Sequence, residues 1–198
     1  MKTIKILSLL FATGLFMASC SNDDETPEEV NEEETITTMT VALIPQGGGA
    51  NVTFVSRDLD GDGPDAPVIT PDDIVLATNT TYSGTVSLLN ETETPSENVN
   101  EEIEAEADEH QFIFTTGGGL NASTAYADEE SDYVSGETGE NFTTNNPVGI
   151  LFTLTTTDAS TGTFTVTLRH EPTKPNDGTL AGAGGETDIT QTFDVTIE

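Results

Sequence analysis

Short runs rich in threonine, valine and aromatic residues recur along residues 36–198, and this pattern most narrowly limits the fold. Apolar and polar residues partly alternate within them, as in "NVTFVSR" and "TYSGTVSLLN". Side chains of a strand point alternately to the two faces of a sheet, so this period of two indicates strands with one buried face. Eight such runs begin at Thr37, Asn51, Thr81, His110, Leu120, Val148, Thr161 and Thr187. We therefore expect an all-β fold.

Turn-forming segments separate these runs. They include "QGGGAN", "GDGPDAP", "TTGGG" and "DASTG", whose glycine, proline and aspartate residues favour turns. Short strands joined by connections of hairpin length are typical of an immunoglobulin-like sandwich. We predict one antiparallel β-sandwich domain of about eight strands over residues 36–198.

One segment breaks the strand pattern. In "PSENVNEEIEAEADE", Val99, Ile103 and Ala107 are spaced four apart among acids, as on one face of an amphipathic helix, and Ser96 precedes them as a cap. We predict a short helix over residues 97–108 at the edge of the sandwich. Residues 128–147 are polar without a period and are predicted to form a long loop.

The first twenty residues have the order of a secretory signal. Two lysines precede an apolar run that ends at Ala18, and Cys20, the only cysteine, follows two small residues. This run is too short for a stable membrane span. Residues 1–19 are therefore predicted to be a signal peptide. An ordinary secretory signal followed by a chance cysteine is the alternative.

The surroundings of Cys20 resemble the lipobox of bacterial lipoproteins, with Met17 where leucine is usual. This resemblance implies cleavage before Cys20 and a lipid anchor on its thiol, in the outer membrane. The acids that follow resemble the signal that exports lipoproteins of Bacteroidota to the cell surface; a periplasm-facing lipoprotein is the alternative. Eight acids and no base lie between Asp23 and Glu34, so residues 20–35 are predicted to be a disordered tether.

Charge limits the partners. The sequence has 36 acidic and five basic residues, a formal net charge of −31, and removal of Lys2 and Lys5 with the signal leaves three bases against 36 acids, or −33. Nucleic acids and anionic lipid surfaces bind through lysine and arginine, so neither is expected as a partner. Cations and basic proteins fit the charge. The alternative is that acidity only keeps a surface protein hydrated in a salty medium.

Five segments together resemble a group of small acidic surface lipoproteins of flavobacteria. They are "RDLDGDGPDAPVIT", "NTTYSGTVSLLNETE", "EADEHQFIFTT", "TVTLRHEP" and "GGETDITQTFDVTIE", and the resemblance spans most of residues 36–198. Such proteins often carry the label "type 1 periplasmic binding fold superfamily", a fold of two α/β lobes, whereas this sequence offers one helix and no alternation of helices with strands. The resemblance implies a surface location and a TonB-dependent receptor as partner.

The segment "DLDGDGPD" is a candidate calcium site. Asp58, Asp60 and Asp62 occupy alternate positions before a glycine, as in the first half of an EF-hand loop, so their carboxylates can converge on one hard cation. The twelfth position is Ile69 instead of glutamate, which excludes an EF-hand, and Asp65, Asp72 or Asp73 would complete a looser site. The alternative is a connection whose carboxylates only form turn hydrogen bonds.

The two histidines form a second candidate site. His110 opens one predicted strand and His170 closes another, each on the core face, so antiparallel neighbours would hold both at one end of the sandwich. A final hairpin would return Glu186 and Asp188 toward His170. Two imidazoles with carboxylates suit a transition metal, most simply zinc. The alternative is a pair of ordinary strand-end residues on strands that are not neighbours.

The residue patterns do not favour an enzyme, since no nucleophile elbow, phosphate loop or catalytic cysteine stands out in the sequence. We weigh three functions. A non-catalytic surface module could capture a divalent metal or metal complex for a TonB-dependent receptor. An adhesion or extracellular-matrix module could use the sandwich for protein or glycan contact, with or without calcium in the Asp58–Asp65 loop. A metal-dependent hydrolase is the third. We prefer the first because of the histidine placement and the resemblance.

Overall fold

The computed structural model describes residues 35–61 and 63–198. The predicted signal peptide over residues 1–19, the lipidation residue Cys20 and all but the last residue of the predicted tether lie outside these ranges, as does Asp62. What the sequence predicts for them stays a prediction. Within the described ranges, no helix is both long and apolar enough to cross a membrane.

Strands make up most of the regular structure in the described part of the chain. They are β1 (Thr38–Pro45), β2 (Val52–Arg57), β3 (Val68–Thr70), β4 (Ile74–Leu76), β5 (Thr81–Asn90), β6 (Glu97–Asn98), β7 (His110–Gly117), β8 (Ala122–Tyr126), β9 (Leu151–Thr156), β10 (Ser160–His170) and β11 (Glu186–Ile197). The helical elements are α1 (Asn100–Ala105), α2 (Leu180–Ala183) and the 3-10 turn η1 (Glu130–Asp132). All eight predicted strands are present. The sequence analysis missed α2 and the strands β3, β4 and β6, because segments this short show no clear period.

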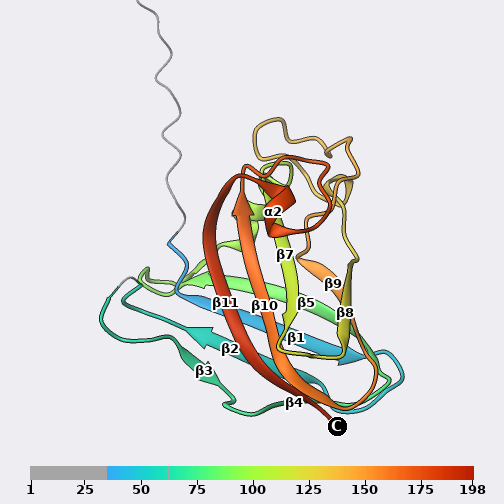
Figure 1. The fold of residues 1–198 in the computed structure, drawn as a ribbon. Helices are drawn as coiled ribbons and strands as arrows, with labels where there is room; N and C mark the ends of the chain where they lie inside the picture. Colours follow the sequence, from blue (N-terminus) through green and yellow to red (C-terminus); the bar gives the residue numbers. More distant parts are fainter. Residues whose placement is uncertain (1–34, 62) are drawn as a thin grey trace, which may run out of the picture. The chain divides into compact units, whose positions relative to one another are not determined.

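The strands form two sheets, one behind the other in Figure 1. One sheet has the order β3-β2-β1-β5-β9-β8, with β6 added to β5, and the other has the order β4-β11-β10-β7. Every strand pair is antiparallel except β11 with β4, which is parallel. The protein is therefore an all-β sandwich with a short helix, as predicted.

The core lies between the two sheets because the alternating apolar side chains face inward. Every second side chain of β5 is buried, from its second residue to its last. Phe54 of β2 packs edge-on against Phe193 of β11, with ring centroids 4.7 Å apart. Phe152 of β9 lies 6.1 Å from Phe164 of β10. Burial of one such side chain contributes roughly 1.5–3 kcal/mol, so these contacts between sheets are a major source of stability.

Helix α1 is shorter than the predicted span of residues 97–108. Residues 97 and 98 instead form β6 against the end of β5, so the helix begins only at Asn100. The predicted cap Ser96 is wrong, because the N-cap position is Val99 and no side chain caps it. The apolar spacing was interpreted correctly, since Val99, Ile103 and Ala107 are all buried.

Asn100 attaches α1 to the sheet. Its side-chain oxygen accepts a hydrogen bond from the Leu88 N–H at 2.6 Å, and its amide nitrogen donates to the Val86 carbonyl at 3.0 Å. Both partners belong to β5, so the helix is held against the middle of the larger sheet. The chain then turns and enters β7 at His110.

The predicted loop over residues 128–147 has little regular structure. It contains η1 and two isolated bridges, which pair Glu129 with Pro147 and Val134 with Asn141. In Figure 1 this loop and α2 lie at the end of the sandwich where β10 finishes. They surround the end of the sheet that carries the two histidines.

Candidate metal centre

The two histidines lie directly opposite each other at one end of the four-stranded sheet. β7 begins at His110, β10 ends at His170, and the antiparallel register pairs these two residues. Each continues the buried face of its strand, which Phe112 and Leu168 occupy two pairs further along. Because opposite residues of a ladder project to the same face, the pairing brings the two rings together, as predicted.

The two imidazole rings are stacked and buried. Their centroids are 4.6 Å apart and their planes are inclined by 25°. His110 is 0% exposed and His170 is 5% exposed. The Nδ1 atom of His110 lies 3.2 Å from the carbonyl oxygen of Glu106, at the end of α1. The pair is therefore a nitrogen donor set that the surrounding chain shields from water.

A β-bulge brings Asp188 to the histidines. The pairing of β10 with β11 shifts between Leu168 and Arg169, which pair with Ile189 and Thr187, so Asp188 is the extra residue of β11. An extra residue locally re-aims a side chain that strict alternation would send to the other face. The Asp188 side chain is 1% exposed, and its Oδ1 lies 3.8 Å from Nδ1 of His170. The predicted approach of Asp188 to His170 is therefore present.

Glu186 was expected to join the site in the same way. The register pairs it with His170, but its side chain is exposed. Among the described residues, neither Glu186 nor Asp188 belongs to either of the two groups whose donor atoms all lie within 4.8 Å of one another. Three other acids take this place: Glu106, Glu109 and Glu171.

The first of these groups, here called the inner group, consists of Glu106, His110 and His170. Glu106 is the residue that ends α1, four positions before His110, so one turn of chain returns its carboxylate toward the ring. Its Oε2 lies 4.0 Å from Nδ1 of His110, and its side chain is 45% exposed. The inner group therefore combines two buried nitrogens with one carboxylate that solvent can reach.

The second group, here called the outer group, consists of Glu109, His170 and Glu171. The Glu171 N–H donates to the Glu109 carbonyl at 2.7 Å, which extends the β7–β10 ladder by one bond beyond the histidines. Both glutamates are exposed. Partial burial raises the pKa of Glu109, and the nearby carboxylates of Glu106 and Asp108 raise it further. The outer group therefore places closely spaced negative charges on the solvent-exposed side of the site.

The donor types of both groups fit a divalent first-row metal. Imidazole nitrogen and carboxylate oxygen are ordinary zinc ligands with bonds of about 2.0–2.2 Å, so donors around a tetrahedral ion lie roughly 3.4 Å apart. The donors here lie within 4.8 Å of one another, so binding requires them to close by about an ångström or more. Rotation of the exposed Glu106 side chain would account for part of this movement.

A buried lysine binds the backbone at His110. The Lys174 ammonium donates to the carbonyls of Ala107 and His110 at 2.6 and 2.7 Å, and it lies 3.1 Å from Oε1 of Glu130. Burial lowers the pKa of Lys174, while the hydrogen bond to Glu130 opposes that shift. The Asn146 amide donates to both oxygens of Glu130. These contacts tie the long loop to the first residue of β7.

A second buried acid holds the same loop. The Asp128 carboxylate accepts hydrogen bonds from the N–H groups of Gly149 and Leu151 at 2.7 and 2.9 Å, and from the Tyr133 hydroxyl at 2.7 Å. Burial raises the pKa of Tyr133, and the hydrogen bond to Asp128 raises it further. The loop is therefore anchored at both the Asp128 and the Glu130 carboxylates.

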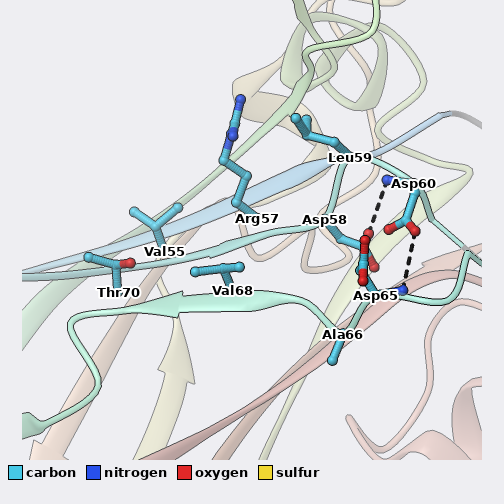
Figure 2. Close-up of a pocket in the computed structure, with 9 residues that line it drawn as sticks. All are labelled: Val55, Arg57, Asp58, Leu59, Asp60, Asp65, Ala66, Val68 and Thr70. Carbon is cyan, nitrogen blue, oxygen red and sulfur yellow. Dashed lines mark hydrogen bonds between the residues drawn. The ribbon is translucent and has the colours of Figure 1, made fainter.

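The predicted calcium loop lies in the connection between the end of β2 and the start of β3, as Figure 2 shows. Asp58 accepts hydrogen bonds from the N–H groups of Asp60 and Gly61 at 3.2 and 3.0 Å, and Asp60 accepts one from the Asp65 N–H at 3.3 Å. Among the described residues these carboxylates do not form a group with all donors within 4.8 Å. Asp62 lies outside the description, so calcium binding here stays a prediction.

The same loop borders a surface hollow of about 590 Å³. Its apolar lining residues are Val55, Leu59 and Val68, and the three described aspartates of the loop line the side next to Leu59. Leu59 is 49% exposed and Val68 is 64% exposed. In Figure 2 the Arg57 side chain points away from the aspartates. Arg57 forms an ion pair with Glu91 instead.

Sequence reasoning did not assign several residues of the histidine end to the site. A signal existed for Glu106 and Glu109, because they precede His110 by four and one positions, and for Glu171, because it follows His170. No local signal marked Lys174 or Glu130, since their contacts join segments far apart in the chain.

Comparison of the chain with protein-family models, curated proteins and solved structures found no match. A fold by itself does not define a function. The chemistry of the histidine end therefore carries the functional argument.

Proposed function

We propose that this protein is a non-catalytic binding module that captures a divalent transition-metal ion at the histidine end of the sandwich. The observation that carries the proposal is the stacked pair of His110 and His170, with carboxylate oxygens within 4.8 Å of their nitrogens. Nitrogen and oxygen donors in this number suit zinc most simply. The surplus of acids over bases favours cation uptake in general.

Capture suits this geometry better than catalysis. A catalytic zinc keeps an open coordination position beside room for a substrate. Here the histidine side chains are 0% and 7% exposed, so a metal bound to their nitrogens is largely enclosed by the protein, with the Glu106 carboxylate on its solvent side. The module would hold its ion until a partner removes it.

The proposal includes an anchor and a partner. The lipobox-like segment around Cys20 supports a lipid anchor in the outer membrane, and the acids after it support the outer face. The resemblance to flavobacterial surface lipoproteins supports a TonB-dependent receptor as the acceptor of the metal or metal complex. A receptor on the same membrane would receive the ion without its diffusion into the medium.

Calorimetric titration with zinc tests the capture. The protein used is residues 35–198, which contain both sheets and the whole core, after removal of metal with a chelator. We expect one equivalent of zinc to bind. His170→Gln should weaken zinc binding by about a hundredfold or more, because loss of even a residue that only orients a ligand costs 10–100-fold. Glu106→Gln should weaken it less, since water can replace a carboxylate.

Glu186→Gln is the matched control. It removes one negative charge at the same end of the sheet, from a residue outside both groups. We expect this variant to bind zinc as the wild type does. Circular dichroism and thermal unfolding of each variant establish that it is folded. Binding of several equivalents that His170→Gln leaves unchanged would contradict the proposal.

The hollow beside the Asp58–Asp65 loop favours a second candidate function, an adhesion or extracellular-matrix module. Its apolar side exposes Leu59 and Val68, which suits contact with a protein or glycan. Calcium titration followed by thermal unfolding tests the part played by the loop. One equivalent of calcium, lost in Asp58→Asn and kept in His170→Gln, would favour adhesion with calcium.

A further inference from the structure

The buried histidines raise the problem of how an ion reaches them. The side chain of His110 is 0% exposed and that of His170 is 7% exposed. A hydrated divalent ion must lose water as it binds, and direct entry to the buried nitrogens offers only one solvent-exposed ligand, the Glu106 carboxylate, to replace that water. A route with intermediate ligands removes this difficulty, because each lost water is replaced at once by a protein donor.

The outer group offers these ligands. Glu109 and Glu171 are exposed, whereas His170, which they share with the inner group, is buried. The three donors lie within 4.8 Å of one another, as those of the inner group do. His170 therefore connects a set of donors open to solvent with a set that is largely enclosed.

The backbone around Glu171 is specialised for this position. Glu171 has φ of 47°, in the left-handed region that a residue with a side chain seldom adopts. Such a conformation persists only where the surrounding structure imposes it. The hydrogen bond from Glu171 to the Glu109 carbonyl holds this conformation at the end of the ladder. The donor that distinguishes the outer group from ordinary surface acids is the buried imidazole of His170.

We propose that the outer group is a loading site for the inner group; this inference rests on the proposed function of metal capture. The ion first binds Glu109, Glu171 and His170 from solvent. It then exchanges the two outer carboxylates for Glu106 and His110 while it stays bound to His170. Two metal–oxygen bonds break, one metal–oxygen and one metal–nitrogen bond form, no electron is transferred, and any proton on the ligating nitrogen of His110 leaves to water.

Stopped-flow kinetics with zinc tests the loading step on residues 35–198. Association is followed by mixing protein with zinc, and dissociation by transfer of zinc to a fluorescent indicator chelator. In Glu109→Gln/Glu171→Gln we expect both rate constants to fall by about tenfold, within the range that charged entrances contribute to association rates. The stoichiometry should stay at one, and the dissociation constant should stay within about threefold of the wild type, because a loading site lies on the path in both directions.

Asp108→Asn/Glu186→Gln is the matched control. It removes the same charge from two exposed acids near the site that belong to neither group. If general attraction by negative charge accounts for the effect, this control will slow association as much as the test variant does, and dissociation will not change in either. That result overturns the loading site.

The remaining outcomes separate the two proposals. Unchanged rates in Glu109→Gln/Glu171→Gln overturn the loading site and leave metal capture intact. A large loss of affinity in this variant also overturns it, because the outer glutamates would then be ligands of the final complex. Absence of zinc binding by the wild type overturns metal capture itself.

Discussion

Lys174 shows how single buried charges organise the histidine end. Its ammonium group has three partners, namely two backbone carbonyls and the Glu130 carboxylate, and its side chain is 5% exposed. A buried charge is tolerated only where such partners replace its water shell. Glu130 is equally enclosed, since its side chain is 1% exposed. Neither residue can change alone without leaving the other charge buried and uncompensated.

Replacement of the lysine tests this interdependence. We expect Lys174→Met to lower the free energy of unfolding by about 3–5 kcal/mol, the usual loss when one partner of a buried ion pair is removed. Urea denaturation measures it. Addition of Glu130→Gln to this variant should restore part of the loss, because a neutral amide carries a smaller desolvation cost. A single variant as stable as the wild type would show that the ion pair does not hold the loop.

Glu91 predicts the response of the fold to acid. The hydrogen bond from Arg57, with another from Thr38, lowers the pKa of Glu91 to about 2 from an ordinary value of 4.5. The folded protein therefore binds this proton more weakly than the unfolded chain does. The stabilisation is fully present above about pH 4.5 and is lost as the pH falls toward 2.

Unfolding measured across this pH range provides the test. Glu91→Gln should be less stable than the wild type by a constant amount above about pH 5, and the difference should shrink toward zero near pH 2. Glu93→Gln removes an exposed acid two residues away and serves as the control. A stability difference that does not change with pH would contradict the assigned ion pair.

At the scale of elements, strand β5 depends on a glycine in its buried face. Gly84 pairs directly with Phe152 of β9, and a methyl group on Gly84 would lie within 3.0 Å of ring carbons of Phe152. The missing side chain leaves the space in which the ring lies across the strand. Phe152 then reaches Phe114, with ring centroids 4.3 Å apart, and so joins the two sheets. One glycine thus permits an aromatic contact between layers.

Alanine at this position should displace the ring. We expect Gly84→Ala to lower the free energy of unfolding by about 1–3 kcal/mol, the usual cost of an extra methyl group in a packed core. Gly47→Ala is the matched control, because no atom lies within 4 Å of the methyl group it would add. Chemical denaturation of both variants measures the difference. Equal stability would mean that the ring moves aside without cost.

At the scale of the whole molecule, the charged side chains lie mainly outside the central strands of the sheets. Along β5, β9 and β10 the only charged side chain is that of Arg169, while the acids of the described ranges lie mainly in the connections and in α1. Outward positions of strands carry threonine and serine, as in the pairs Thr165–Thr192 and Thr167–Thr190, whose hydroxyls are 2.9 and 2.8 Å apart. Repulsion among the acids therefore concentrates at the ends of the sandwich, where the histidines also lie.

Salt should stabilise such a molecule. The chain has a formal net charge of −31, and like charges destabilise the compact state unless ions screen them. We expect the thermal unfolding temperature to rise as sodium chloride increases from about 0.01 to 0.5 M, over which the screening length falls from roughly 30 Å to a few ångströms. Sucrose at matched water activity is the control for exclusion from the protein surface. A flat or falling dependence would show that ion pairs outweigh the repulsion.

The sequence by itself determined the longer strands and the class of fold. Alternation within a strand is a local property, because each residue points to the face opposite its neighbour, and it located all eight of the longer strands. It also placed His110 and His170 on the buried face at strand ends. The turns between the strands were recognised for the same reason, since glycine and aspartate favour a turn in the backbone at their own position.

Only the tertiary structure decided which ends meet and which acids reach the histidines. The register of β7 on β10 placed the two rings in contact, and a single bulge in β11 brought in Asp188 while Glu186 remained exposed. The Lys174 contacts formed between segments that no local pattern connects. Pairing and bulges depend on packing between residues distant in the chain, and that free energy is absent from any short stretch of sequence.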